Sequence, residues 1–422
     1  MGPLRRTRLD TTGCDPGLVG ASMTDSSDAP PAETDGTPAR SRGTRLPQQP
    51  DGPAWLTVTS PLLPDADDLI PLIRDILDSR WVTNQGRYAR ELEARLATYL
   101  GVDDLVLVTN ATVALEMAFL EAIDDGEVII PAFSFPATWN LFFENPRFKP
   151  VFVDIGEDFR VDPDAVEAAI TPRTTAIVAV HTYGFPCDHA RLRQLANTHN
   201  LRLIYDSAHA FGVREQGAPI ASLGDLNIYS FHATKVYNTL EGGCITGDPL
   251  LLERLRRRRN FGLSREEQSC FGTNGKVDEF RAAVGLLNLN TVDDAISARA
   301  KVARYYLDAL PARTGLLKVY PHDLFPAGRT HNHAYFPVRV SPDAPLGRDA
   351  LLDALKADGI LARRYFYPTP TTSALYRSVV DPAALPVTRA CSLDTLCLPV
   401  HHHMTVADCA HVVDSLARAL HA

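Results

Sequence analysis

Hydrophobic and polar positions divide the 422-residue chain into a polar arm and a long region of alternating helix and strand patterns. Residues 1–54 contain no Phe, Tyr or Trp and are rich in Pro, Asp, Ser, Thr, Gly and Arg. Such a composition buries too little apolar area to offset the entropy that is lost on ordering, so we predict a disordered arm. Translation starts at either Met1 or Met23, and the sequence leaves both open.

From Trp55 onward the pattern is that of an ordered protein. Apolar residues at helical spacing predict amphipathic helices over 66–79 and 87–100, and further helices in NATVALEMAFLEA, which Asn110 caps, and DHARLRQLANTHN. Short apolar runs between the helices are predicted as strands: DLVLV, EVIIP, FKPVFVDI, TAIVAVHTYG, LRLIYDSAHAFG and DLNIYS. Apolar strands that alternate with helices are typical of a mostly parallel sheet that is covered on both faces. We therefore predict an α/β fold.

The domain division follows from where this alternation stops. The sheet pattern ends near residue 290, and a long helix over about 290–312 is expected to lead into a smaller unit. That unit contains a strand in NHAYFPVRV and helices in GRDALLDALKADGI and TVADCAHVVDSLARAL. We predict the disordered arm over 1–54, a large domain over 55–290 and a small α+β domain over 291–422.

Composition restricts the class of partner and the compartment. The chain carries 42 Lys and Arg against 51 Asp and Glu, so its net charge of −9 gives no basic field for nucleic acid. No apolar run approaches the roughly 18 residues that span a bilayer, and the N-terminus lacks the apolar stretch of a secretory signal. Seven scattered cysteines without CxxC spacing are typical of reduced thiols. We expect a cytoplasmic protein that binds neither nucleic acid nor membrane.

The segment SFHATKVYNTLEGG, residues 230–243, contains one lysine among small, polar and aromatic residues. A lysine that is held in a partly apolar cleft loses proton affinity through desolvation and becomes an amine nucleophile. Lys235 is therefore a candidate for a Schiff base with a carbonyl or with pyridoxal phosphate (PLP). The alternative for any single lysine is a solvated surface charge.

An acid at a strand end favours the PLP hypothesis. Asp206 ends the apolar strand LRLIYD, and a carboxylate at the C-terminal end of a buried parallel strand faces the ligand cleft. PLP chemistry needs such an acid to keep the pyridine nitrogen protonated. His209, three residues further on, is placed for the phenolic oxygen of the cofactor. Taken singly, Asp206 is more typical of a capping or turn aspartate, and His209 of a core histidine.

The phosphate and the ring of PLP also have candidate partners. The segment TNATVAL turns a strand into a helix, so the N–H groups of Ala111 and Thr112 point toward one spot, where a phosphate binds well. Ser230 adds a hydroxyl, and Phe135 in PAFSFPATW is placed to stack on the pyridine ring. Each residue alone is typical of a cap or of core packing, but five features together indicate a PLP site: the phosphate cradle, the stacking aromatic ring, the strand-end acid, the hydroxyl and the lysine.

These motifs resemble those of the PLP-dependent nucleotide-sugar aminotransferases of the DegT/DnrJ/StrS type, from about residue 60 to the C-terminus. The matching stretches are VTNQGRYARELEARLATYLGV, NATVALEMA, EVIIPAFSFPATWN, PVFVDI, AVHTYGFPCD, YDSAHAFG, SFHATK followed by EGG, and GTNGKVDEFRAAVGL, which is the loop that crosses the dimer interface in the family. The resemblance implies the aspartate aminotransferase-like fold of PLP-dependent transferases (fold type I), with a large domain built on a mostly parallel mixed sheet and a smaller α+β C-terminal domain.

The resemblance also implies the role of each site residue. Lys235 forms the Schiff base with PLP and shuttles protons, Asp206 pairs with the pyridine nitrogen, and His209 approaches the phenolic oxygen. Phe135 stacks on the ring. The expected phosphate contacts are Ala111, Thr112 and Ser230, with Asn274 contributed from the partner subunit, and the expected substrate contacts are Tyr183, Arg363 and Tyr365. Three positions depart from the family's usual pattern: Tyr205 stands where glutamate is common, His209 where glutamine is common, and the crossing loop reads TNGK.

Within the family, the motifs look most like those of enzymes that aminate C4 of dTDP-4-keto-6-deoxyglucose. Such enzymes take the amino group from L-glutamate and work as homodimers with active sites that both chains build. Two alternatives stay open: an aminotransferase for a 3-keto-sugar or a keto-cyclitol, and a regulatory protein that binds PLP without turnover. Related PLP-dependent dehydratases replace the lysine by histidine, and Lys235 argues against that class.

Two further clusters are conspicuous. The basic run RLRRRRN, residues 254–260, is either a solvated helix face or an attractor for the nucleotide diphosphate. The HHH at 401–403 suggests a metal site, but three adjacent side chains of a strand cannot all point one way, and no acid or cysteine has ligand spacing. We predict no metal.

Overall fold

The computed structural model describes residues 55–264, 267–319 and 330–421. The arm predicted over 1–54 lies outside the described residues. In the described part of the chain, no helix combines the length and the apolar character that a bilayer crossing requires.

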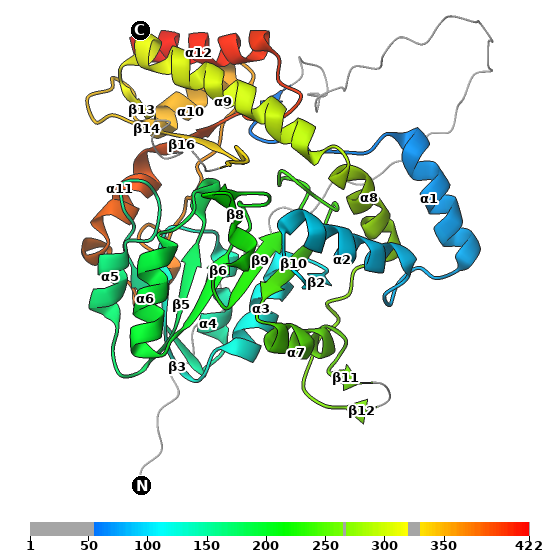
Figure 1. Ribbon diagram of the computed structural model, residues 1–422. Helices are drawn as coiled ribbons and strands as arrows, with labels where there is room; N and C mark the ends of the chain where they lie inside the picture. The colour runs from blue at the N-terminus through cyan, green and yellow to red at the C-terminus, as the bar shows by residue number, and fades with distance from the viewer. Residues whose placement is uncertain (1–54, 265–266, 320–329, 422) are drawn as a thin grey trace, which may run out of the picture. The chain divides into compact units, whose positions relative to one another are not determined.

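A seven-stranded sheet forms the centre of the structure (Figure 1). Its order is β2 (Leu105–Val108), β10 (Gly243–Gly247), β9 (Leu226–Ser230), β6 (Arg202–Asp206), β5 (Thr174–Val180), β3 (Gly126–Pro131) and β4 (Phe148–Val153). Strand β10 pairs antiparallel with both of its neighbours, and all other pairs are parallel. The predicted α/β fold with a mostly parallel mixed sheet is therefore confirmed. Strand β10 was not predicted.

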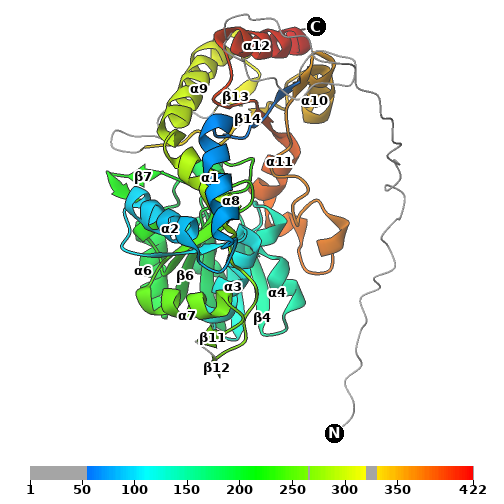
Figure 2. The ribbon, with the colours of Figure 1, turned by 90° about the vertical axis from the view of Figure 1, so that its right-hand side faces the viewer.

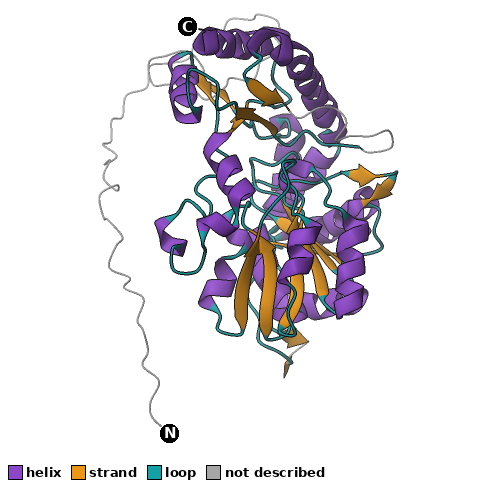
Figure 3. Cartoon of the chain, turned by 90° about the vertical axis from the view of Figure 1, so that its left-hand side faces the viewer, coloured by secondary structure: helices purple, strands orange, loops and turns teal. Residues whose placement is uncertain are grey.

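Helices cover both faces of this sheet, as Figure 3 shows. One face packs against α3 (Ala111–Ala122), α4 (Asn140–Glu144) and α7 (Pro249–Arg259). The other packs against α2 (Arg87–Leu100), α5 (Pro163–Ala169), α6 (His189–His199) and α8 (Glu279–Leu289). Neighbouring residues of one strand point to opposite faces, so that Val106 packs with α3 while Leu107 packs with α2. Because both faces are buried, the strands are apolar throughout.

Three helices have the predicted limits: α1 (Ala66–Ser79), α2 and α3. The strand predicted from TAIVAVHTYG ends at Val180, because Thr182–Gly184 form a 3₁₀ turn in which Tyr183 takes a φ of 57°. In the predicted crossing loop, a helix (α8) begins at Glu279, where the Asp278 side chain accepts a hydrogen bond from the Arg281 N–H at 2.9 Å. That cap explains the helix start.

A second, antiparallel sheet lies in the C-terminal part of the chain. Its order is β13 (Leu317–Val319), β14 (Phe336–Val340) and β16 (Thr395–Leu398), and it shares a core with α9 (Val292–Thr314), α10 (Arg348–Ala357) and α12 (Val406–His421) (Figure 2). Leu56 of β1 (Leu56–Thr57) joins this core and pairs with β15 (Ile360–Leu361). The predicted domain boundary at residue 290 stays a prediction.

The remaining elements are short: β7 (Arg214–Glu215), β8 (Ala218–Pro219), β11 (Leu263–Ser264), β12 (Glu267–Gln268) and α11 (Pro386–Asp394). Helix α11 leads directly into β16.

Candidate active site

The candidate site lies where two neighbouring parallel strands end. Asp206 ends β6 and Ser230 ends β9, and both side chains are buried. Lys235 follows β9 in a tight turn, in which its N–H donates to the carbonyl of His232 at 2.8 Å. The carboxyl ends of parallel strands meet at one edge of a sheet, so the fold brings these sequence-predicted residues together.

Asp206 is a buried acid with two internal donors. The Thr138 hydroxyl donates to Oδ2 at 2.8 Å, and the Ala208 N–H donates to Oδ1 at 3.1 Å. Burial raises the pKa of Asp206, while these two hydrogen bonds and the charge of Lys235 oppose the rise. Each carboxylate oxygen has a second lone pair, so Asp206 can still accept a hydrogen bond from a protonated ring nitrogen.

Lys235 is partly buried beside aromatic rings. Its Nζ lies 5.9 Å from the centroid of the Tyr335 ring. Burial lowers the pKa of Lys235 to about 8, against the opposing charges of Asp206 and Tyr365. A considerable fraction of the amine is therefore neutral near pH 8, which is the form that attacks a carbonyl carbon.

His209 is buried and held in one orientation. Its Nδ1 accepts a hydrogen bond from the Tyr183 N–H at 3.2 Å, and its ring stacks on Phe366 with 5.6 Å between centroids. Burial, and then the charge of Lys235, lower the pKa of His209 well below its usual value. The ring is therefore neutral, and because Nδ1 accepts, its proton is on Nε2. The Nε2–H group can therefore donate a hydrogen bond to a phenolic oxygen.

The N-terminus of α3 has the form of a phosphate cradle. Asn110 caps the helix by accepting from the Val113 N–H at 2.9 Å, and the amides of Ala111 and Thr112 at the first positions have no acceptor within the helix. Gly243 of β10 lies against this turn. A Cβ at Gly243 would come within 3.0 Å of the Ala111 nitrogen, so the second glycine of EGG lets β10 approach the cradle.

Phe135 and Asn274 occupy exposed positions. Phe135 is 57% exposed and directly precedes the short helix that presents Thr138 to Asp206. Asn274 forms a bridge to Asn260 in its own chain, and the next carbonyl, that of Gly275, accepts from the Thr109 N–H at 2.8 Å. The stacking role of Phe135 and the reach of Asn274 into a second subunit stay predictions.

The three predicted substrate residues differ in burial. Tyr183 is completely buried, and its hydroxyl donates to the carbonyl of Tyr365. Tyr365 is partly buried and meets the Tyr335 ring edge-on, 5.3 Å between centroids. The Arg363 side chain is exposed and has no ion pair within the described ranges. In this structure Tyr183 supports the segment that carries Tyr365, and direct contact between Tyr183 and a substrate stays a prediction.

Sequence reasoning missed three residues of the site: Thr138, Tyr335 and Phe366. Thr138 lies in the quoted segment PAFSFPATW, and its spacing of three from Phe135 was the available signal. Tyr335 and Phe366 contact His209 from the C-terminal part of the chain. Nothing local in the sequence indicates those contacts.

The structure also bears on the two clusters that the sequence left unassigned, the basic run 254–260 and the three histidines 401–403. In the basic run, Arg256 pairs with Asp104, Arg258 with Glu121 at 3.0 Å, and the buried Arg259 with Glu93 at 2.6 Å. The run is thus partly internal and largely paired rather than a simple solvated face. Across the described ranges, no group of three or more His, Cys, Asp or Glu is arranged to hold a metal ion.

The fold is that of the PLP-dependent transferases of fold type I, and its solved structural neighbours are sugar aminotransferases. A solved structure of DesI in the presence of its TDP-sugar product has a TM-score of 0.80 and 37% identity, covering 87% of this chain and 94% of that chain. The chain belongs to the DegT/DnrJ/EryC1/StrS aminotransferase family, whose sequence model matches residues 65–417. The predicted family and fold are confirmed.

Two curated relatives cover nearly the same region. The dTDP-4-amino-4,6-dideoxy-D-glucose transaminase of Shigella dysenteriae is 38% identical over 85% of this chain and 97% of its own length. The dTDP-3-amino-3,4,6-trideoxy-alpha-D-glucose transaminase of Streptomyces venezuelae is 35% identical over 79% of this chain and 89% of its own length.

Proposed function

We propose that this protein transfers the amino group of L-glutamate to C4 of dTDP-4-keto-6-deoxyglucose, with PLP as cofactor, and so forms dTDP-4-amino-4,6-dideoxyglucose. The observation that carries the transfer chemistry is the pairing of a lysine of lowered pKa with a buried strand-end acid. The near full-length similarity to a dTDP-4-amino-4,6-dideoxy-D-glucose transaminase supports the choice of sugar.

The residues at the site fit PLP. When bound, PLP supplies an electron-withdrawing ring that stabilises negative charge at the reacting carbon. Asp206 would keep the ring nitrogen protonated, and the neutral His209 would donate from Nε2 to the phenolic oxygen. The amides of Ala111 and Thr112, with the Ser230 hydroxyl, would bind the phosphate. The Lys235 Nζ would attach the cofactor and then carry the proton that moves during transfer.

Substrate recognition is proposed for the segment that carries Arg363 and Tyr365. Arg363 is exposed and has no ion pair among the described residues, so its guanidinium is available to the diphosphate of a nucleotide sugar. Burial raises the pKa of Tyr365, while the charges of Arg363 and Lys235 oppose the rise, so both charges lie close enough to act on Tyr365. A sugar bound there has its keto carbon near the lysine and its diphosphate toward solvent.

A homodimer with shared sites is part of the proposal. Several large apolar side chains are exposed near the predicted crossing loop and after α1, including Trp81 at 53% and Phe271 at 88%. Such side chains favour burial against a partner.

The six described cysteines form no disulfide, which supports the cytoplasmic location expected from the sequence.

Amination at C3 is the second candidate, because the Streptomyces venezuelae relative, whose name specifies a 3-amino sugar, is nearly as similar. A keto-cyclitol aminotransferase has no specific observation in its favour, and a non-catalytic PLP-binding regulator stays an alternative.

The direct test is to incubate the protein with PLP, L-glutamate and dTDP-4-keto-6-deoxyglucose, and to locate the new C–N bond by nuclear magnetic resonance. The proposal predicts an amine at C4 and one 2-oxoglutarate for each sugar. An amine at C3, or no product while a 3-keto-sugar reacts, would replace the 4-aminotransferase by the second candidate.

A further inference from the structure

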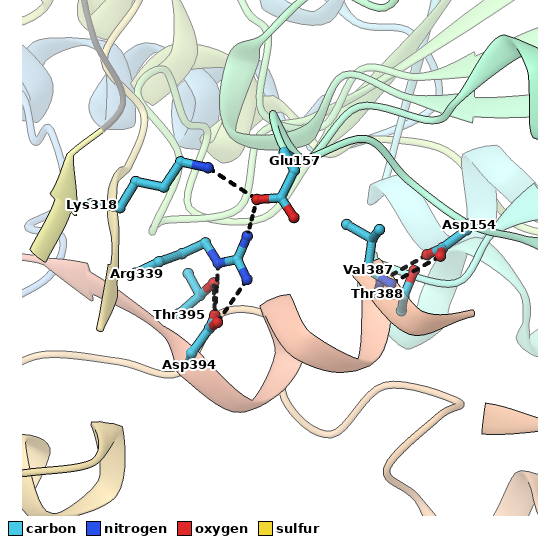
Figure 4. Close-up of polar contacts among 8 residues, drawn as sticks. All are labelled: Asp154, Glu157, Lys318, Arg339, Val387, Thr388, Asp394 and Thr395. Atoms are coloured by element: carbon cyan, nitrogen blue, oxygen red, sulfur yellow. Dashed lines mark hydrogen bonds and ion pairs between the residues drawn. The ribbon is translucent and has the colours of Figure 1, made fainter. Parts of the chain in front are cut away.

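Two acidic residues that follow β4 contact elements more than 150 positions further along the chain, and Figure 4 shows both sets of contacts. The Asp154 carboxylate accepts from the Val387 N–H at 2.9 Å and from the Thr388 N–H at 2.7 Å. These N–H groups open helix α11, whose own N-cap residue, Leu385, offers no side-chain hydrogen bond. Asp154 thus caps α11 from a distant loop and also complements its dipole.

Helix α11 in turn holds the segment 363–366. The Ser392 hydroxyl, in the second half of the helix, donates to the carbonyl of Phe366 at 3.1 Å. The chain then enters β16, where Cys397 and Arg363 exchange backbone hydrogen bonds of 2.8 and 3.1 Å. Segment 363–366 is therefore bound at both of its ends. Phe366 is bound to α11, which Asp154 caps, and Arg363 is bound to β16, which directly follows α11.

Segment 363–366 packs directly on the candidate active site. Phe366 stacks on His209, with ring planes inclined by 13° and centroids 5.6 Å apart. Tyr365 contacts the Tyr335 ring, whose centroid lies 5.9 Å from the Lys235 amine. A displacement of α11 consequently changes where Arg363 and Tyr365 stand relative to Lys235.

We propose that Asp154 is a positioning residue for substrate binding: by capping α11 it holds residues 363–366 against His209 and so sets the affinity for the sugar substrate. The inference rests on the proposed function of that segment. Within the described residues, the Asp154 carboxylate accepts hydrogen bonds from the Ile155, Val387 and Thr388 N–H groups and from none of the proposed cofactor residues. Loss of the Asp154 carboxylate should therefore affect substrate binding more than cofactor binding.

The matched control is Glu157, the second acid of the same loop. Its carboxylate accepts from Lys318 Nζ at 2.9 Å and from the Arg339 guanidinium, but Arg339 keeps a second carboxylate partner, Asp394, at 2.7 Å. Among the described residues, no hydrogen bond or ion pair joins Glu157 directly to α11 or to segment 363–366. Removing it takes the same charge from the same loop without uncapping the helix.

The experiment compares wild type, Asp154→Ala, Asp154→Asn and Glu157→Ala with PLP bound. Since small misplacements of binding groups cost up to about a hundredfold, we expect Asp154→Ala to raise KM for the keto-sugar about tenfold, with kcat and PLP affinity within about twofold of wild type. Asp154→Asn keeps one acceptor oxygen, so its KM for the keto-sugar should lie between those of wild type and Asp154→Ala. Hydrogen exchange at backbone amides of residues 361–369 should quicken in Asp154→Ala and stay unchanged in Glu157→Ala.

Two results would overturn the inference. One is unchanged exchange at 361–369 in Asp154→Ala. The other is a parallel loss of kcat, PLP affinity and stability, which indicates general destabilisation rather than positioning. If wild type itself fails to aminate the keto-sugar, the proposed function fails, and the exchange measurement still decides whether Asp154 holds the segment.

Discussion

Burial determines the chemistry of Lys235 at the scale of single residues. An exposed lysine is almost fully protonated at neutral pH, whereas burial lowers the pKa of Lys235 to about 8 even though Asp206 favours its charged form. Desolvation therefore outweighs the attraction between the two charges at this site. The same burial keeps His209 neutral, so one physical cause prepares both a nucleophile and a hydrogen-bond donor.

The lowered pKa predicts how the cofactor-free protein takes up PLP at different pH values. Below about pH 8 the Lys235 amine is protonated and has no lone pair to attack the aldehyde; above it the amine is neutral. The rate of covalent PLP binding should rise with pH, with a midpoint near 8. Stopped-flow absorbance measures this rate, and a lysine peptide, whose amine titrates near 10.4, is the control. A protein midpoint equal to that of the peptide would contradict the proposed environment of Lys235.

Thr138 should tune the acid that faces the cofactor. Its buried hydroxyl donates to Asp206 at 2.8 Å, and hydrogen bonds to charged groups contribute about 1.5–3 kcal/mol. In Thr138→Val the pKa of Asp206 rises further, so we expect kcat to fall about tenfold and the acidic limb of its pH profile to move to higher pH. Steady-state kinetics measure both.

Thr246→Val is the matched control for this substitution. Thr246 is also buried and donates to the carbonyl of Ala221 at 2.7 Å, on β10 and away from Asp206. It should lower stability without moving the acidic limb. A Thr138→Val profile that coincides with wild type would show that Thr138 does not tune Asp206.

Sequence reasoning placed residues whose role follows from a strand end or a helix start, and it missed those that depend on distant packing. The apolar runs show where the strands end, which allowed Asp206 and Ser230 to be assigned. The helical pattern shows where α3 begins, which allowed Asn110 to be assigned. Phe366 and Tyr335 could not, because their contacts with His209 join positions more than 120 residues apart, as do the hydrogen bonds between Asn332 and the carbonyls of His209 and Phe211. The pKa shifts were equally out of reach, since they depend on burial.

At the scale of elements, α2 lacks an N-terminal cap of its own. Gly86 stands at the cap position, and the buried carboxylate of Glu279, from α8, accepts from the Tyr88 N–H at 2.7 Å and from the Ala89 N–H at 3.4 Å. A Cβ at Gly86 would lie 2.4 Å from the carboxyl carbon of Glu279, so glycine leaves room for the remote cap. This contact joins two helices of the same face of the sheet.

We predict that Glu279→Ala lowers the free energy of unfolding by about 1–3 kcal/mol, because it leaves two N–H groups of α2 without their acceptor. Denaturant unfolding measures the change. Glu253→Ala is the control, since Glu253 is exposed and its ion pair within the described ranges is with Arg257, four residues along its helix. The substitution should change stability by less than about 0.5 kcal/mol. Equal effects of the two substitutions would argue against a remote cap.

Elements with a clear period were predicted almost to the residue, and those set by long-range pairing were not. The amphipathic pattern predicted the limits of α1 and α2, whereas β10 begins and ends with a glycine and joins the sheet between β2 and β9. Helix α8 lies in a segment that the family resemblance assigned to a loop.

At the scale of the whole molecule, the proposed homodimer predicts that two inactive variants restore one another. If Asn274 serves the phosphate site of the partner subunit, a mixed dimer of Lys235→Ala and Asn274→Ala contains one site with both defects and one intact site. Coexpression should then give up to about a quarter of wild-type activity, since about half of the dimers are mixed. The two variants purified separately and assayed together without subunit exchange are the control. Absence of recovery in the mixed dimers would place Asn274 in the site of its own chain.

The most direct test of the central assignment is the absorbance spectrum of the PLP-treated protein before and after L-glutamate is added. We predict a visible band from lysine-bound cofactor in wild type, its absence in Lys235→Ala, and its conversion by L-glutamate to the spectrum of the amine form of the cofactor. The same band in Lys235→Ala, or no band in wild type, would contradict the role of Lys235, and a wild-type band that L-glutamate leaves unchanged would contradict the proposed amino donor.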